Sequence, residues 1–221
     1  KGGYMTYQEI YKELKKKIKF PKKKTHKISD IKVEDCDDIT VIVYSIAKKS
    51  KLKKKPDLLE IGLSGSKEEK LHFIKENVGK EISVMDIYKT GDLIDLRGLT
   101  KGKGLVGPVK RFGIQLKQHK SEKGVRRPGS LGPWHPARVT FRAPLAGQLG
   151  MFTRTTRNHK IIEIGNSEKR FRNIKNYGDT NSDYIVVSGS VQGTAKRQLV
   201  ISSPLKETKK QIKKNYELVK I

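Results

Sequence analysis

The 221-residue chain has a single cysteine, Cys36, one tryptophan and few aromatic residues overall (7%). One cysteine cannot form an intramolecular disulfide or supply a Cys-rich zinc site, which favours a reducing compartment. The longest apolar run, around residues 39–47, is too short to cross a bilayer, and no signal-peptide pattern opens the chain. We therefore expect a soluble, intracellular protein that has no membrane partner.

Acidic residues are also scarce. The chain has 23 Asp and Glu against 49 Lys and Arg, which gives a formal net charge of +26. A field of this strength repels itself unless an anionic partner neutralises it. With 34% hydrophobic residues the chain can bury one modest core. Its length suggests one domain with additions or two small domains, and we favour one domain with basic extensions.

Motifs for catalysis and for metal binding are missing. The sequence has no HExxH zinc motif, no GxSxG nucleophile elbow and no P-loop. The acidic stretch at residues 34–38 could bind a divalent ion, but a solvated acidic turn is the simpler interpretation. The histidines are scattered without cysteine neighbours, at His26, His72, His119, His135 and His159. We therefore expect no enzymatic activity, no metal, no cofactor and no small-molecule substrate.

One stretch of the sequence matches a nucleotide-binding motif. Residues 102–107 (GKGLVG) match the dinucleotide fingerprint GxGxxG, with Glu122 at about the right distance downstream. A dinucleotide site needs the third glycine to open a helix that binds the pyrophosphate. Because Pro108 and the residues after it show no helical period, we expect no helix here and reject this interpretation.

Periodicity predicts short strands joined by turns, with a few helices. Amphipathic helices are expected at residues 5–20 and 66–79, the second with Leu71, Ile74 and Val78 facing inward. A short basic helix or tail ends the chain at 205–221. Strands are expected at 38–47, 57–63, 160–165, 183–191 and 197–204, with two more on either side of Thr90–Gly91 within 81–100.

These elements predict a mainly β fold with peripheral helices (α+β), in which a small β-barrel is interrupted by a long basic extension. The expected parts are a basic helical segment and linker (1–38), the first part of the barrel body with an inserted helix (39–100), the extension (101–160), the second part of the barrel body (161–205) and a basic tail (206–221).

The basic extension, residues 101–160, differs sharply from its surroundings. It holds fourteen Lys and Arg but one acid, Glu122, together with five of the eight prolines and nine of the twenty glycines. Seven of the eleven arginines lie in it: Arg111, Arg126, Arg127, Arg138, Arg142, Arg154 and Arg157. Arginine suits phosphate and base recognition because its guanidinium is planar and forked. The composition therefore predicts a segment that is ordered by a structured RNA.

The only tryptophan lies within this extension, in the stretch GPWHPARVTFRAPLAGQLG (residues 132–150). Pro133 and Pro136 flank it, and no strand or helix period surrounds it. We interpret Trp134 as an exposed ring that stacks on RNA, on a tip that the prolines stiffen before binding. His135 and His159 are expected to donate to phosphate or to stack on a base.

Three motifs in this order resemble the universal large-subunit ribosomal protein L-three family in its archaeal and eukaryotic form: TKGKGLVGPVKRFG, GSLGPWHPARV and AGQLGMFTRTTRNHKI. The resemblance covers residues 39–205 and implies a translation-type β-barrel with a finger that reaches toward the peptidyl transferase centre. It also implies that the family's basic N-terminal stretch is missing before Lys1. The matching positions are Lys101, Gly102, Gly104, Gly107, Lys110, Arg111, Gly132, Trp134, His135, Pro136, Ala137, Gly147, Gln148, Gly150, Arg154, Asn158 and Lys160.

The sequence thus predicts a structural protein of the cytoplasmic ribosome that binds large-subunit rRNA, adjoins other large-subunit proteins and supports assembly. The alternatives are a basic chromatin or nucleoid protein and an RNA-modifying enzyme, the second of which lacks a visible cofactor or metal site. The residues predicted to bind RNA are Lys101, Lys103, Lys110, Arg111, Arg126, Arg127, Trp134, His135, Arg138, Arg142, Arg154, Arg157, Asn158, His159 and Lys160.

Overall fold

The structure is a computed structural model that describes residues 14–15, 17–19, 36–46, 51–166 and 171–216. Most of the helix predicted at 5–20 and of the basic linker after it lies outside the described residues, as does the end of the C-terminal tail. The chain divides into two compact units, residues 1–92, 160–188 and 214–221 and residues 93–159 and 189–213.

In the first unit, β1 (Thr40–Tyr44) pairs antiparallel with β2 (Leu58–Gly62) to form a two-stranded sheet. The β-branched residues of β1 suit a pleated strand, as the sequence predicts. Just before β2, the Lys53 ammonium forms an ion pair with the Asp57 carboxylate. The sequence gives no sign that this pair forms its own sheet instead of joining the strands of the main sheet.

The helix predicted at residues 66–79 is confirmed as α3 (Lys67–Asn77). Its start is fixed by a capping box, in which the Ser66 hydroxyl accepts from the Glu69 amide and the Glu69 carboxylate accepts from the Ser66 amide. Leu71 is buried, whereas Ile74 and Val78 are only half-buried. The Lys70 ammonium lies 2.6 Å from the Asp38 carboxylate, and its hydrogen bond lowers the pKa of that carboxyl group.

The prediction of a strand before Thr90–Gly91 is wrong. Residues 84–86 form a 3-10 turn, η3 (Val84–Asp86), and only the strand after Gly91 is present, as β3 (Leu93–Leu99). The Ser83 hydroxyl accepts from the Met85 amide, and the Asp86 carboxylate accepts from the Ser83 amide. Such side-chain bonds to nearby backbone compete with strand pairing, which explains the difference.

The main sheet has the strand order β7-β6-β3-β8. In the second unit β3 pairs antiparallel with β8 (Leu199–Ser202), and in the first unit β6 pairs antiparallel with β7 (Asp183–Val187). The long strand β6 (Thr153–Asn166) carries the chain from the second unit into the first. Ile94 of β3 and Ile161 of β6 are completely buried. The mainly β, α+β fold class is thereby confirmed.

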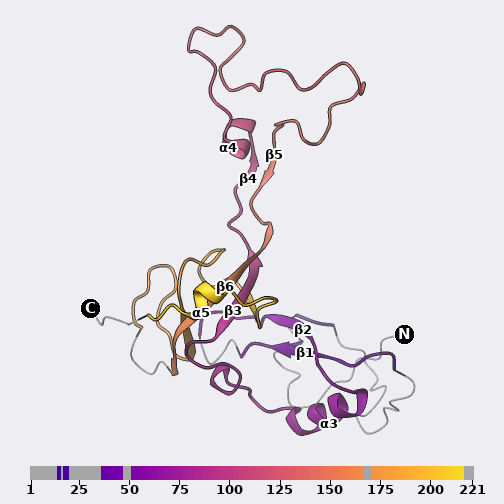
Figure 1. Ribbon diagram of the computed structural model, residues 1–221, viewed down its shortest axis with the longest axis vertical. Coiled ribbons are helices and arrows are strands. Elements are labelled where there is room, and N and C mark those ends of the chain that lie inside the picture. Colours follow the sequence, from indigo (N-terminus) through magenta and orange to yellow (C-terminus); the bar gives the residue numbers. More distant parts are fainter. Residues whose placement is uncertain (1–13, 16, 20–35, 47–50, 167–170, 217–221) are drawn as a thin grey trace. The chain divides into compact units, whose positions relative to one another are not determined.

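The second unit also contains a short ribbon, in which β4 (Gly104–Val106) pairs antiparallel with β5 (Gly147–Leu149). Between these strands lie α4 (Pro108–Phe112) and residues 113–146, here called the basic loop, which contain no helix or strand. Figure 1 shows β4 and β5 side by side, with α4 next to them. A last short helix, α5 (Lys209–Ile212), belongs to the same unit.

The prediction that no helix follows Gly107 is wrong, because α4 begins at Pro108 with Gly107 as its N-cap. Proline is favoured at the first helical position and Gly113 ends the helix in a left-handed conformation (φ 70°), so local sequence explains the element. The helix has only five residues, and β4 is paired with an antiparallel strand. The arrangement is therefore not the parallel βαβ unit that a dinucleotide fingerprint requires.

Candidate nucleic-acid interface

The basic loop presents two aromatic rings to solvent. Trp134 is 87% exposed and Phe141 is 91% exposed, whereas aromatic rings usually bury a large apolar area. The Arg142 guanidinium carbon lies 5.9 Å from the centroid of the Phe141 ring, within range of a cation–π contact. Exposed rings with arginine beside them suit the stacking of unpaired bases.

Eleven of the fifteen side chains predicted to bind RNA are exposed and come from the residues just before β4, from α4, from the basic loop and from the start of β6. They are Lys101, Lys103, Lys110, Arg126, Arg127, Trp134, His135, Arg138, Arg142, Arg154 and Arg157. Within residues 101–160 only Glu122 opposes the positive charge of fourteen Lys and Arg. The segment therefore has the density of exposed cations that binding to a phosphate backbone requires.

The remaining four predicted residues are engaged within the fold. The Arg111 guanidinium donates from Nε to the Gln148 carbonyl (3.2 Å) and from Nη1 to the Leu145 carbonyl (2.9 Å). Lys160 is buried, and its ammonium donates to the Lys214 carbonyl. The half-buried His159 ring lies beside Gly189, 3.6 Å from where a Cβ would be.

Asn158 joins three segments of the second unit. Its amide N–H donates to the buried Asp95 carboxylate (2.8 Å), and its Nδ2 donates to the Lys206 carbonyl (3.1 Å) and to Thr208 Oγ1 (2.9 Å). Its φ of 57° places it in the left-handed region within strand β6. These contacts give Asn158 a structural role, and its contact with RNA stays a prediction, as do those of Arg111, His159 and Lys160.

Sequence reasoning missed several residues that shape this surface. Phe141 satisfies the same criterion as Trp134, an aromatic side chain in a segment without strand or helix period, and could have been found in that way. Gln192 could not, because its role depends on distant backbone. Its Nε2 donates to the carbonyls of Leu96 (2.9 Å) and Arg154 (3.0 Å), which fixes the strand that carries Arg154.

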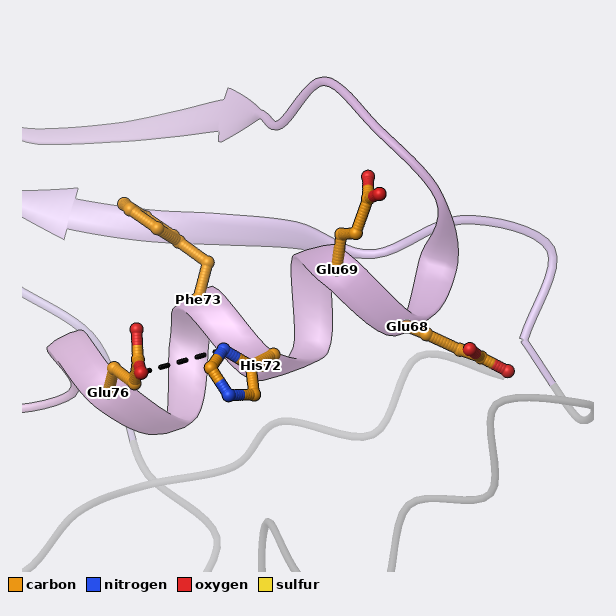
Figure 2. A pocket seen from close by; sticks show the side chains of 5 residues that line it. All are labelled: Glu68, Glu69, His72, Phe73 and Glu76. Carbon is orange, nitrogen blue, oxygen red and sulfur yellow. Dashed lines mark ion pairs between the residues drawn. The ribbon is translucent and has the colours of Figure 1, made fainter.

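One face of α3 carries an acidic patch, although Lys67 and Lys75 of the same helix are also exposed. Figure 2 shows five side chains that project from this one helix and line a shallow hollow: Glu68, Glu69, His72, Phe73 and Glu76. His72 Nδ1 lies 3.6 Å from the Glu76 carboxylate. Three carboxylates repel phosphate, so we do not assign RNA contacts to this face.

No group of three or more His, Cys, Asp or Glu side chains is arranged to hold a metal ion in the part of the chain that the structure describes. Among the helices described, none combines the length and the apolar composition that crossing a bilayer requires.

Comparisons with known proteins agree with the motifs. The family model described as ribosomal protein L3 matches residues 1–220. Proteins named large ribosomal subunit protein uL3 are similar to the chain: that of Methanocaldococcus jannaschii is 40% identical over 91% of this chain and 63% of its own length, and that of Methanococcus vannielii is 42% identical over 86% and 60%. The chain thus spans about 60% of the length of the relatives that it matches.

Proposed function

Because the chain belongs to the ribosomal protein L3 family, we propose that it is a non-catalytic constituent of the large ribosomal subunit that binds large-subunit rRNA. The names of its relatives support the first part of this proposal. The second part rests on the surface of the second unit. The proposed partners are large-subunit rRNA and neighbouring large-subunit proteins, and the proposed location is the ribosome in the cytoplasm.

The observation that carries the RNA proposal is the combination of exposed rings and exposed arginines in one loop. Trp134 and Phe141 are almost fully exposed, and the basic loop between them and around them carries Arg126, Arg127 and Arg138 toward solvent. Such rings stabilise a complex when a partner covers them, because their apolar surface is then removed from water. A partner that supplies both flat apolar faces and negative charge is single-stranded or irregular RNA.

In the proposed mechanism the cations bind first and the rings bind second. Lysine and arginine side chains attract the RNA over a distance and displace counterions from its phosphates. Trp134 and Phe141 then stack on unpaired bases, which orders the basic loop. We propose that the ordered loop is the family's finger and that it reaches toward the peptidyl transferase centre, where it supports the RNA without taking part in the chemistry.

The proposal is tested by binding of the full chain to deproteinised large-subunit rRNA from Methanocaldococcus jannaschii, with small-subunit rRNA and duplex DNA as competitors. We expect preference for the large-subunit rRNA and a steep loss of affinity with salt, with a log–log slope of about 0.7–0.9 for each phosphate contacted. Equal affinity for duplex DNA would support the chromatin alternative instead. A flat salt response would contradict phosphate binding altogether.

Replacing Trp134 with alanine is expected to weaken binding to large-subunit rRNA by about 1–3 kcal/mol, the usual worth of one stacked base. The stability of the free protein should not change, because the side chain is 87% exposed and covers no core residue. Binding titrations and denaturant unfolding measure the two effects. Trp134→Phe is the control, since it keeps a ring that can stack and should retain most of the affinity. Equal losses in both variants would contradict stacking.

A further inference from the structure

We propose that Arg111 is a positioning residue: with Gly147 it locks the two ends of the basic loop together, instead of contacting a phosphate. The inference rests on the proposed function, because it concerns how the rRNA-binding loop is held. It differs from the interpretation of the sequence, in which Arg111 is one of seven equivalent RNA-binding arginines.

The hydrogen bonds of Arg111 show what it holds. The residue lies in the last turn of α4, immediately before the basic loop begins, and its guanidinium crosses to the strand where the loop returns. Nε donates to the Gln148 carbonyl (3.2 Å), within β5, and Nη1 donates to the Leu145 carbonyl (2.9 Å), just before β5. The planar guanidinium therefore binds two points of one backbone segment, which fixes α4 relative to β5.

Gly147 provides the space for the guanidinium. It lies between the two accepting residues and opposite Val106 in the β4–β5 ladder. A Cβ at Gly147 would lie 2.7 Å from Arg111 Nη1, 2.8 Å from Cζ and 3.0 Å from Nη2, closer than real side chains allow. The guanidinium is flexible enough to move aside, but it would then lose both carbonyl acceptors.

The lock lies at the two ends of the basic loop, where it can limit the motion of the loop. Residues 113–146 contain no helix or strand, so the loop is held mainly at its two ends. One end is α4 and the other is β5, and Arg111 joins them. Tying the ends lowers the conformational entropy that the loop loses when RNA orders it, and so raises affinity without adding a contact to RNA.

A phosphate contact and a lock predict different salt slopes. The salt slope is the slope of the logarithm of RNA affinity against the logarithm of salt concentration. A phosphate contact contributes about 0.7–0.9 to the log–log slope, and its removal lowers the slope by that amount. A lock contributes to affinity but not to the number of counterions released. Arg111→Lys keeps the charge and loses the forked geometry, whereas Gly147→Ala keeps Arg111 intact and displaces it. Both variants therefore separate geometry from charge.

The experiment compares Arg111→Lys, Gly147→Ala and the double variant in the full chain, with the same deproteinised large-subunit rRNA as probe. Gly62→Ala is the control, because Gly62 ends β2 in the first unit, with open space around it and without a left-handed φ. Hydrogen exchange of the free proteins, measured by mass spectrometry, follows the amides of β4 and β5 and, for comparison, those of β3 and β8.

We expect each single variant to bind about tenfold more weakly, because the released loop loses more conformational entropy when RNA orders it, with an unchanged salt slope. The double variant should lose no more than either single variant, since both break the same lock. Exchange should speed up in β4 and β5 but not in β3 and β8. The control should resemble the wild type.

Three results would overturn the lock: wild-type affinity in Arg111→Lys, additive losses in the double variant, or unchanged exchange in β4 and β5. A further variant, Arg111→Gln, removes the charge: a drop of its salt slope by about 0.7–0.9, with unchanged exchange, would instead assign Arg111 to a phosphate. If the wild type shows no preference for large-subunit rRNA, the proposed function fails. The exchange measurements on the free proteins still test the lock in that case.

Discussion

Replacing Gly150 with alanine is expected to destabilise the second unit by about 3 kcal/mol or more, since left-handed strain and a backbone clash add together. The φ of Gly150 is 79°, and a Cβ there would lie 2.0 Å from the Lys101 carbonyl oxygen and 2.9 Å from the Gly102 Cα. Both neighbours are backbone and cannot rotate away as a side chain can. The backbone at position 150 would therefore have to move away from Lys101.

Gly104→Ala is the matched control for this prediction. Gly104 has a similar φ of 68° but open space where its Cβ would lie, so its replacement should cost only the strain of a left-handed residue, about 1–2 kcal/mol. Denaturant unfolding gives both values, and hydrogen exchange at the Lys103 amide, which donates to the Leu149 carbonyl, locates the damage. Equal destabilisation by the two variants would show that the close backbone approach is not present.

Replacing four arginines of the basic loop with glutamine is expected to produce the largest functional loss. Arg126, Arg127, Arg138 and Arg142 are all exposed. If each contacts a phosphate, the salt slope for binding to large-subunit rRNA should fall by roughly three, at about 0.7–0.9 per contact. Stability should stay near that of the wild type, because exposed side chains contribute little to it.

The control for this variant changes the same number of charges elsewhere. Lys54, Lys55, Lys75 and Lys80 are exposed in the first unit, and their replacement with glutamine lowers the net charge equally. We expect a much smaller change of the slope from this control, since it alters only the general field of the protein. An equal loss in both variants would show that net charge, and not the basic loop, governs binding to RNA.

Much of the fold can be predicted because its signals are local. The β-branched residues of β1, the capping residues of α3 and the turn before β3 each act within a few residues of sequence. The chemical character of the basic extension is equally plain, since composition changes at Lys101. Trp134 is recognised as exposed because its neighbours offer no apolar cover.

The two wrong predictions, of a strand before Thr90 and of no helix after Gly107, also have local causes. Ser83 and Asp86 turn the chain where apolar residues favour a strand, and Pro108 with Gly113 brackets a helix too short to show a period. In both places capping and turn chemistry outweighs the hydrophobic pattern.

The roles of individual cations could not be predicted from local sequence. Arg111 and Lys160 are cations of the same basic extension as exposed residues such as Arg126, yet both donate to backbone carbonyls. Those carbonyls belong to residues that lie far away in sequence and come close only in the folded chain. Composition therefore predicts that the segment binds RNA, but not which of its cations are available for it.

The most direct test of the central claim is sedimentation of the tagged protein from a native lysate through a sucrose gradient, with a high-salt wash and with RNase treatment. Membership of the large subunit predicts that the protein migrates with large subunits, stays with them through the wash and is released when the RNA is digested. Migration as free protein, or with DNA, would contradict it.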